Sequence, residues 1–487
     1  MKATNLARSL ALAGLVIALG ACDNGLTDVN DNPNAPIDVG PGFLLPQAIQ
    51  ASVRNVFGSG TMLSHTSIWP QQTVQIQYPV EEIGQVRPAT MQALWDGFYA
   101  GYLTDTRVII EKGKASEKGN IEGVGLVWKA WLYSQLTDLF GDIPYSEALK
   151  GAENTTPVYD TQKNVYTGIL KDLTDAVPKL GTGGDFGAGD LLYGNDFGKW
   201  KKFANSLRMR FAMRLSEVDA ATARAQFSSA YSAGGFTSNG DNAMLEYPGA
   251  PYRNPLYENA LCGSGNRDDH GMSATMVDTL KSFNDPRLAL YAEPAAHDGQ
   301  YRGLGNGIEL PPLSLDWYSR IGNFWRCDGA TTPSAVMTYA EVLFLEAEAA
   351  ARGWIAADPA ALYTAAIRAN MRQWDPWGPA NAPAAAAVDA YLAQPRVAYA
   401  GGAAGLNQIH LQKWIALFMQ GGEAWANWRR VGVPDLKKGP NLVVSRIPIR
   451  MIYPDNEQSL NKTNLMEAVS RQGGGLDLVT PVWWDKQ

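Results

Sequence analysis

Apolar side chains recur at helical spacing along most of the chain from about residue 41 onward. The clearest segment has Trp128, Trp131, Leu132 and Leu136 at a period of 3.6 residues, which is typical of the buried face of a helix. Segments with this pattern lie near residues 90–112, 121–139, 162–178, 196–217, 220–233, 335–353, 358–373 and 405–430. Runs that favour a strand are few and short, such as 442–445. The pattern therefore predicts a mostly α-helical fold.

Some of the predicted helices come in pairs that resemble each other. The segment 339–349 is followed, after Gly353, by 361–367, and 166–176 has a related rhythm of large and small side chains. Stacked helix pairs of the tetratricopeptide type need small residues where helices cross closely and large residues in the grooves. The spacing of the pairs is irregular, so a general helical bundle fits the periodicity equally well.

Four long stretches lack this periodicity. They are rich in Gly, Pro, Asn and aromatic residues, and they span residues 70–90, 181–194, 234–267 and 294–333. Loops of this length within a compact domain are usually functional or disordered. We therefore expect a ligand to meet the loops.

The N-terminus has the pattern of a secretory signal peptide. Lys2 and Arg8 precede an apolar run at 10–19, and Leu19-Gly20-Ala21-Cys22 follows. Leucine three residues before a cysteine indicates the lipoprotein type, in which the thiol is acylated and becomes the first mature residue. The apolar run has about half the length of a membrane-spanning helix. We predict a signal peptide at 1–21 and lipidation of Cys22. An ordinary signal peptide with a chance cysteine is the alternative.

Residues 22–40 are rich in Asn, Asp and Pro and have no periodicity, which predicts a flexible tether between the lipid and the folded body. No later stretch reaches transmembrane length. We therefore expect the membrane to hold the protein through the lipid anchor only.

Composition and charge narrow the functional classes. Asp and Glu number 48 against 41 Lys and Arg, and this balance argues against nucleic-acid binding, which needs a basic face. Apolar residues make up 46% of the chain, enough for a sizeable core. Aromatic residues make up 10%, with 15 Trp and 20 Tyr. Most of them belong in a core, but a surplus at the surface would suit sugars or peptides.

Apart from Cys22, the chain has two cysteines, Cys262 and Cys327. In an exported protein an even pair is a disulfide candidate. The bond would close a long loop, and loop-closure entropy would then stabilise the fold by about 4 kcal/mol. Two separate buried thiols are the alternative.

Three blocks of sequence carry more information than periodicity. The first is Thr137-Asp138-Leu139-Phe140-Gly141-Asp142-Ile143-Pro144-Tyr145-Ser146-Glu147-Ala148, in which Gly141 favours a helix end and Pro144 prevents its resumption. The second, 190–210, is a tight turn that leads into a helix with several basic residues. The third consists of Ile447, Pro448, Ile449, Arg450, Tyr453, Pro454, Glu457, Asn461, Asn464, Trp484 and Asp485. The segment 284–288 and the helix predicted at 340–353 belong to the same set.

Together with the lipidated N-terminus, these blocks resemble the SusD/RagB family of nutrient-binding outer-membrane lipoproteins over nearly the whole chain. The resemblance implies one SusD-like domain at 41–487, mostly α, with four tetratricopeptide-like helix pairs (an α-α superhelix) and a loop-rich ligand-binding half. It also implies attachment to the outer membrane, facing the cell exterior, and a TonB-dependent transporter of the SusC type as partner. We expect Tyr145, Glu147, Trp200, Asn205 and Arg208 to shape the scaffold.

Two loop clusters combine aromatic and polar side chains in the way that sugar sites require. The clusters are Trp69, Gln72, Gln77 and Tyr78, and then Trp317, Tyr318, Arg320 and Trp325. Rings offer a face for stacking, while amide and guanidinium groups bond to hydroxyls. A peptide backbone fits the same groups, so the predicted ligand is an oligosaccharide or, less favoured, a peptide. Alternatively, these aromatic residues pack the loops onto the helical body.

Signals for catalysis are weak. The chain lacks the Gly-x-Ser-x-Gly, His-Glu-x-x-His and phosphate-loop motifs. The four histidines, His65, His270, His297 and His410, are far apart in sequence. The sequence Asp268-Asp269-His270 predicts a solvated turn, and the glycine-rich segment 303–307 predicts a flexible loop. The segment 185–196 has several Asp residues, which is the only feature that would favour a calcium site there. We therefore expect no catalytic residue, no metal and no cofactor.

The leading hypothesis is a lipoprotein of the cell surface, not an enzyme, that captures an oligomeric nutrient and delivers it to the transporter. The alternative is a secreted α-helical glycoside hydrolase or lyase, which needs an acid and a base about 5–10 Å apart in a cleft. A structural or adhesive surface protein is a third hypothesis.

Overall fold

The structure is a computed structural model and describes residues 38–378 and 382–485. The chain divides into two units, Met1–Gly40 and Pro41–Gln487. The predicted signal peptide, Cys22 and all but the last three residues of the predicted tether lie outside the described residues. Of the helices in the described ranges, none is both long enough and apolar enough to cross a bilayer.

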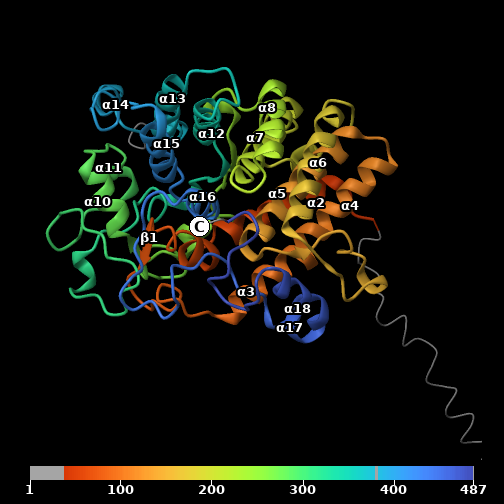
Figure 1. Cartoon of the computed structure of the whole chain (residues 1–487), viewed down its shortest axis with the longest axis horizontal. Coiled ribbons are helices and arrows are strands. Elements are labelled where there is room, and N and C mark those ends of the chain that lie inside the picture. Colours follow the sequence, from red (N-terminus) through yellow and green to blue (C-terminus); the bar gives the residue numbers. More distant parts are fainter. Residues whose placement is uncertain (1–37, 379–381, 486–487) are drawn as a thin grey trace, which may run out of the picture. The chain divides into compact units, whose positions relative to one another are not determined.

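Helices dominate the second unit (Figure 1). The first are α2 (Pro41–Phe57), α3 (Pro88–Asp96), α4 (Leu103–Ala115), α5 (Gly119–Phe140), α6 (Gln162–Lys179), α7 (Phe197–Arg214) and α8 (Ala220–Ala233). The later ones are α9 (Pro255–Asn259), α10 (Ala274–Ser282), α11 (Leu288–Tyr291), α12 (Tyr339–Ala351), α13 (Pro359–Arg372), α14 (Ala385–Leu392), α15 (Gly402–Ala416), α16 (Gly421–Val431), α17 (Asp455–Leu460) and α18 (Lys462–Arg471). The mostly α fold predicted from the periodicity is confirmed.

Shorter helical turns join several of these helices. Two are π-helical, η1 (Ser59–Thr66) and η2 (Gly97–Tyr102). The 3-10 turns are η3 (Gly151–Glu153), η4 (Gly187–Gly189), η5 (Asn239–Asp241), η6 (Leu315–Trp317), η7 (Gly329–Thr331) and η8 (Asp375–Trp377). Since η2 directly follows α3 and precedes α4, the helix predicted at 90–112 is present but contains a widened turn.

Strands are short and form three two-stranded antiparallel sheets, in which β1 pairs with β5, β2 with β3 and β4 with β6. The strands are β1 (Thr73–Gln75), β2 (Ile143–Pro144), β3 (Tyr159–Asp160), β4 (Ala243–Leu245), β5 (His270–Met272) and β6 (Ser334–Met337). The prediction of a strand at 442–445 is wrong, because this segment is irregular. Among the described residues, its one hydrogen bond to a neighbouring segment runs from the N–H of Val443 to the carbonyl of Ile83.

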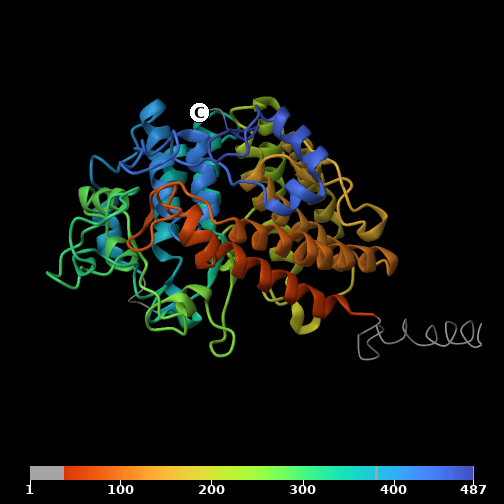
Figure 2. The same ribbon diagram turned by 90° about the horizontal axis from the view of Figure 1, so that it is seen from below.

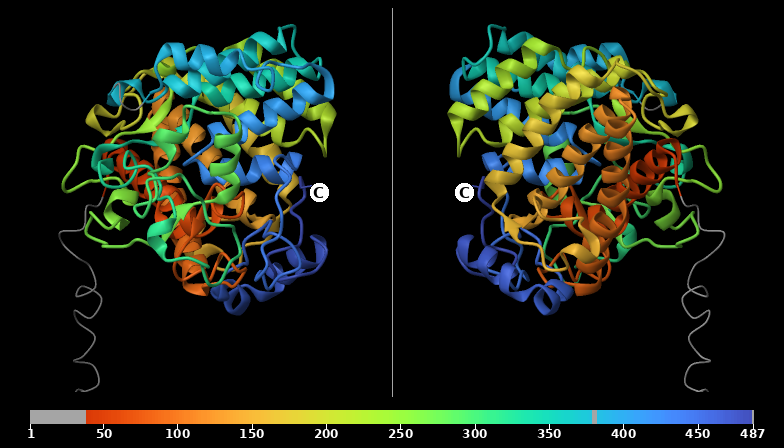
Figure 3. Two further views of the ribbon diagram at one scale, coloured as in Figure 1. Left: turned by 90° about the vertical axis from the view of Figure 1, so that its left-hand side faces the viewer. Right: turned by 90° about the vertical axis from the view of Figure 1, so that its right-hand side faces the viewer.

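Neighbouring helices pack in chain order, α4 on α5, α5 on α6, α6 on α7 and α7 on α8, and α2 lies along α4 (Figures 1 and 2). A second group is formed by α12, which packs against α13 and α15. α17 contacts α3, and α18 contacts β3. Both helices lie at the lower edge of each view in Figure 3, in dark blue. Helix hairpins of this kind are what the paired segments in the sequence predict.

Side-chain caps fix where the helices begin. The residue before the first turn accepts a backbone N–H in seven of the described α-helices, at Thr161, Asp196, Asp219, Asn254, Ser273, Thr338 and Asp358. Each such cap stabilises its helix by about 1 kcal/mol. At the other end of α5, Gly141 has a φ of 89°, a conformation that glycine adopts without strain, so the helix ends there as predicted.

One predicted helix, 405–430, is two. α15 ends at Ala416 and α16 begins at Gly421, and between them Met419 has a φ of 62°. The break turns the chain so that both helices present apolar faces to the core, since Trp414 and Trp425 are fully buried. Continuous periodicity could not indicate it, because both halves have the same spacing.

A buried ion-pair network joins α7, α12 and α16. Arg210 donates to Glu341, at 2.7 Å from Nε to Oε1, and Arg430 donates to Glu348 at 2.6 and 2.7 Å. Burial alone would raise the pKa of Glu423, but the charges of Arg214 and Arg210 outweigh it and lower that pKa to about 2. Glu423 therefore stays ionised, and the ion pairs tie the helices into one frame.

Candidate functional site

Three segments far apart in the sequence run side by side around β1. In the β1–β5 pair, Thr73 lies opposite Met272 and Gln75 opposite His270. The N–H of Met272 also bonds to the carbonyl of Ser319 at 2.9 Å. A Cβ on Gly271 would lie 2.9 Å from that carbonyl oxygen, so glycine allows the third segment to approach. This frame brings the two predicted loop clusters together.

The first exposed aromatic ring of this frame is Tyr78. It follows β1, has a φ of 53° and is 63% exposed. The guanidinium of Arg267 lies 5.7 Å from the ring centroid, and its Nε donates to Asp269 at 2.7 Å. Gln77 beside it is half-buried, and its N–H bonds to the carbonyl of Asp269. Tyr78 thus offers a ring to solvent with a cation at its side.

The second aromatic ring is Trp317, which ends the turn η6 and is half-buried. His297 stacks on it with 3.6 Å between ring centroids, and the guanidinium of Arg302 lies 4.9 Å from the indole. Arg302 also donates to the carbonyl of Trp317 at 2.9 Å and to Asp298 at 2.8 Å. The indole is therefore fixed in place among polar groups that can bond to a ligand.

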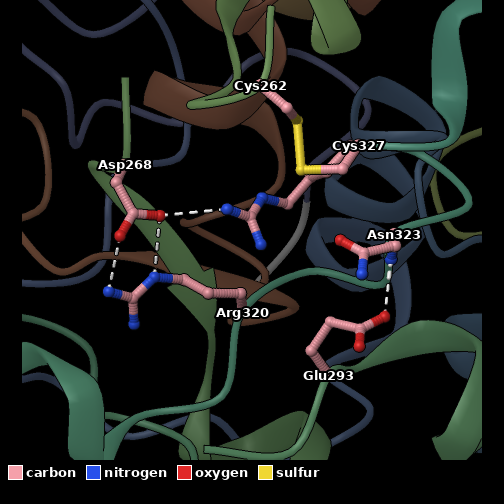
Figure 4. The surroundings of a disulfide bond; sticks show 7 residues. Cys262, Asp268, Glu293, Arg320, Asn323 and Cys327 are labelled. Carbon is pink, nitrogen blue, oxygen red and sulfur yellow. Dashed lines mark hydrogen bonds and ion pairs between the residues drawn. A yellow bond between two sulfur atoms is a disulfide. The ribbon is translucent and has the colours of Figure 1, made fainter. Parts of the chain in front are cut away.

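Arg320 anchors the loop that carries Trp317. Its Nε and Nη2 donate to the two oxygens of Asp268 at 2.8 and 2.7 Å, and Arg326 donates to the same carboxylate at 3.0 Å (Figure 4). Nη1 of Arg320 bonds to two carbonyls of its own loop. With so many bonds already made, Arg320 acts mainly on the shape of the loop.

A disulfide joins Cys262 and Cys327 across this region, with 5.4 Å between the Cα atoms (Figure 4). Beside it, the N–H of Asn323 bonds to Glu293 at 2.8 Å. The covalent bond and the ion pairs of Asp268 connect the same two loops. Together they restrict how far the loops can separate.

Glu82 fixes the neighbouring loop. It accepts N–H groups from Gln75 at 3.1 Å, Asn306 at 2.8 Å and Gly307 at 3.0 Å. Burial raises its pKa to about 7, although the three donors favour the ionised form. The prediction of a flexible loop at 303–307 is therefore wrong, because Glu82 and the buried Leu304 hold it to the frame.

Four of the eight predicted ligand residues are buried. Trp69, Gln72, Tyr318 and Trp325 are between 0 and 4% exposed. The surrounding chain covers these side chains, and the cavity beside Trp325, about 20 Å³, is far below the volume of about 300 Å³ or more that small-molecule sites occupy. Ligand contact therefore stays a prediction for Gln77, Tyr78, Trp317 and Arg320 only.

The contacts of the buried residues explain their positions. Trp69 packs on Trp425 with 4.8 Å between centroids, and Gln72 donates to the carbonyl of Trp414 at 2.6 Å. Trp325 packs among four aromatic rings, Tyr291, Phe324, Trp374 and Phe418. Tyr318 belongs to a small cluster with Val74, Ile76 and Leu304. They are the residues that pack the loops onto the helical body.

Sequence reasoning missed several residues of the frame. The solvated turn predicted at Asp268-Asp269-His270 is wrong, since Asp269 is buried and His270 lies in β5, where burial lowers its pKa to about 4. His297 and Arg302 were not expected beside Trp317. The only sequence signal for these two residues is that His297, Asp298 and Arg302 occur close together in the Gly- and Pro-rich stretch 294–333.

The scaffold prediction for the family blocks can be followed residue by residue. Trp200 is fully buried and donates to Asp190 at 2.8 Å, and Asn205 bonds to the carbonyl of Gly234 at 2.9 Å. Tyr145 bonds to Asp172 at 3.1 Å. In the Asp-containing segment 185–196, the carboxylate of Asp190 accepts the N–H groups of Leu192 and Asn195 and so stabilises the turn. Over the described ranges, no group of three or more His, Cys, Asp or Glu side chains is placed to hold a metal.

Comparisons with known proteins give the family. Residues 33–454 match the family model SusD-like, described as starch-binding and associating with the outer membrane. None of the curated proteins compared with the chain matches it.

Solved structures agree with the family model. One, called a chitin-binding protein, is 30% identical, with a TM-score of 0.80 over 92% of this chain and 100% of its own. A chitin-binding SusD homolog from Flavobacterium johnsoniae is 26% identical (TM-score 0.79, 91% and 98%). A SusD homolog from Bacteroides fragilis is also 26% identical (TM-score 0.76, 92% and 100%). By sequence and by fold, the chain belongs to the SusD/RagB family.

Proposed function

We propose that this protein is a lipoprotein of the outer membrane that binds an oligosaccharide rich in N-acetylglucosamine at the face formed by Tyr78 and Trp317, here called the ligand face. The observation that carries the proposal is the 30% identity, over 92% of the chain, to a protein called chitin-binding. The second chitin-binding relative supports the same ligand class. Lipidation at Cys22, orientation to the cell exterior and delivery to a SusC-type transporter are further parts of the proposal.

The chemistry of the ligand face suits a saccharide. Tyr78 supplies an exposed ring face for the apolar side of a sugar. Trp317, which already carries His297 on its ring, supplies the exposed part of its indole, and each ring has a guanidinium beside it. Gln77 supplies a half-buried amide with both a donor and an acceptor. A neutral sugar with an acetamido group uses each of these features.

Binding without hydrolysis is favoured over the glycoside hydrolase alternative by the carboxyl groups near Trp317. A hydrolase needs a general acid whose pKa is raised. The hydrogen bond from Arg302 instead lowers the pKa of Asp298, and the hydrogen bond from Ser314 lowers that of Asp316. Both carboxyls are therefore ionised at neutral pH and cannot donate a proton to a leaving group.

The experiment is a calorimetric titration of the full-length protein in detergent with chitotetraose, maltotetraose, cellotetraose and a tryptic casein digest. We expect saturable binding of chitotetraose, weakened at least about tenfold in Tyr78→Ala/Trp317→Ala. The matched control is Tyr252→Ala, which removes a tyrosine that is 55% exposed on a separate turn. Unchanged affinity in the double variant would contradict the ligand face.

The hydrolase alternative is tested on the same samples. We expect no increase in reducing ends when chitotetraose is incubated with the protein, and release of shorter sugars would favour the alternative. Delivery is tested by co-purification of a TonB-dependent transporter with the protein from native outer membranes. Absence of any such transporter would contradict that part of the proposal.

A further inference from the structure

A second concave site lies away from the ligand face. It is a groove of about 470 Å³ between α3, η2 and α4 on one side and α17 with the 144–157 loop on the other. We call it the α3–α17 groove. Its lining residues are Gln92, Trp95, Asp96, Tyr99, Ala100, Thr104, Arg107, Pro144, Ala148, Leu149, Gly151, Asn154, Pro157, Asn456, Glu457 and Leu460. The volume is within the range of about 300–1,000 Å³ that small-molecule sites occupy, and no lining residue belongs to the ligand face.

The floor of the groove is aromatic and rigid. The rings of Trp95 and Tyr99 are 4.9 Å apart, and Trp95 also packs on Phe140 and Tyr453. The hydroxyl of Tyr99 donates to the carbonyl of Pro144 at 2.7 Å, which connects the two walls. The Tyr99 ring itself stays half-buried, so part of it faces the groove.

The backbone is irregular on both walls. On one side the π-helical turn η2 contributes Tyr99 and Ala100. On the other side Leu149 has a φ of 66°, a left-handed conformation that a leucine rarely adopts. Both π-helical turns and left-handed non-glycine residues occur preferentially at functional sites. Here the two irregularities face one groove.

The rim of the groove is polar. Side-chain amides come from three different elements, Gln92 on α3, Asn154 in the loop and Asn456 on α17. Gln92 is held in place, since it accepts the N–H of Asn456 at 3.1 Å and donates to Asp96 at 2.7 Å. The Nε of Arg107 is buried and has no hydrogen-bond partner among the described residues. At this rim, the side-chain amide of Asn456 can both donate and accept hydrogen bonds.

The groove has no excess of positive charge, because Asp96 and Glu457 line it together with a single arginine, Arg107, which is paired with Glu111. A neutral ligand therefore fits better than an anion. The amides surround the floor from three sides instead of following one line. This arrangement suits a compact ring with several hydroxyls more than an extended peptide backbone.

We propose that the α3–α17 groove is a second saccharide site that takes an N-acetylated sugar at the end of an oligosaccharide. Tyr99 and Leu149 contact the apolar face of the sugar and the acetamido methyl, and the side-chain amide of Asn456 bonds to its hydroxyl and amide groups. The amide of Asn154 stays bonded to Glu147 and to the N–H of Thr156 and shapes the rim. Leu460, which is 71% exposed at the mouth of the groove, covers the next sugar. The choice of ligand class rests on the proposed function, but the site does not.

The test uses chitotetraose and the full-length protein in detergent. Isothermal titration is carried out on the ligand-face variant Tyr78→Ala/Trp317→Ala, with and without Asn456→Ala/Leu460→Ala. We expect residual binding in the ligand-face variant, weakened at least about tenfold when the groove substitutions are added. The matched control adds Asn164→Ala/Met466→Ala, an exposed amide and a part-exposed aliphatic residue outside the groove.

Hydrogen exchange locates the bound sugar. In the ligand-face variant, chitotetraose should protect η2 and residues 144–151, and Ala100→Trp, which fills the groove from its exposed edge, should abolish this protection. Binding by the wild-type protein that is lost completely in the ligand-face variant would overturn the second site and leave the proposed function intact. Residual binding of a tryptic casein digest in place of chitotetraose would overturn it too. If chitotetraose protects η2 and the Tyr78→Ala/Trp317→Ala variant binds it with wild-type affinity, the result would contradict the ligand face and support the groove.

Discussion

Removal of the Cys262–Cys327 disulfide should destabilise the protein by about 4 kcal/mol. The two cysteines are 65 residues apart. In the chain-entropy account, closing a loop of this length removes about 14 cal/mol/K of entropy from the unfolded chain, which is about 4 kcal/mol at 25 °C. The perturbation is Cys262→Ser/Cys327→Ser, which leaves no free thiol at the site. The native loops keep the ion pairs of Asp268, so the folded structure should change little.

The assay is unfolding in urea, followed by tryptophan fluorescence under non-reducing conditions. We expect the variant to unfold at a lower urea concentration than the wild type, and the wild type with reductant to match the variant. Reductant should have no effect on the variant, which is the control. Hydrogen exchange should rise first at residues 258–270, since this loop loses its covalent connection.

The reasoning would be refuted by a variant whose free energy of unfolding lies within about 1 kcal/mol of the wild-type value, the range of an ordinary substitution. That result would mean that the unfolded chain gains little entropy when the loop opens, and the connection between the loops in the folded state would then rest on the Asp268 ion pairs. Adding Asp268→Asn to the double variant separates the two contributions. A large further loss would assign the connection to the ion pairs.

Three other perturbations test different parts of the molecule. Glu423→Gln should lower the free energy of unfolding by about 3–5 kcal/mol in chemical denaturation, because buried arginines lose their counter-charge, while Glu217→Gln at a more exposed pair should cost about 1 kcal/mol or less. The pKa of Glu82 is raised from 4.5 to about 7, so the folded state binds more protons between these values and stability should fall as pH rises through this window, by about 3 kcal/mol. Glu82→Gln should flatten the pH dependence of unfolding by that amount, and an unchanged slope would contradict the shifted pKa. Cys22→Ser should release the protein from the membrane fraction on cell fractionation, and continued sedimentation with membranes would contradict lipid anchoring.

Local features of this chain were predictable because their causes are local. The end of α5 at Gly141 follows from the conformational freedom of glycine, and the starts of α6 and α7 follow from Thr161 and Asp196, whose side chains accept the first N–H groups. The positions of the long loops follow from their Gly and Pro content. In each case the deciding atoms lie within four residues of one another.

The ligand residues were less predictable because long-range contacts decide them. Trp69 and Tyr78 belong to one loop with the same aromatic and amide composition, yet Trp69 packs on Trp425 and Tyr78 points to solvent. A tryptophan that meets its partner more than 350 residues later carries no local sign of it. The same holds for His297, whose stacking on Trp317 depends on how the 294–325 segment folds back on itself.

Anchored loops have a consequence for binding. The disulfide, the two arginines on Asp268 and the three donors on Glu82 hold the backbone around Tyr78 and Trp317 before any ligand arrives. A ligand then has little backbone entropy to remove, so more of the contact energy contributes to affinity. Side chains at the tips can also change without disturbing the helices below them. One helical frame can therefore present different ligand faces, and in this family the exposed loop residues should indicate the ligand better than the blocks that identify the fold.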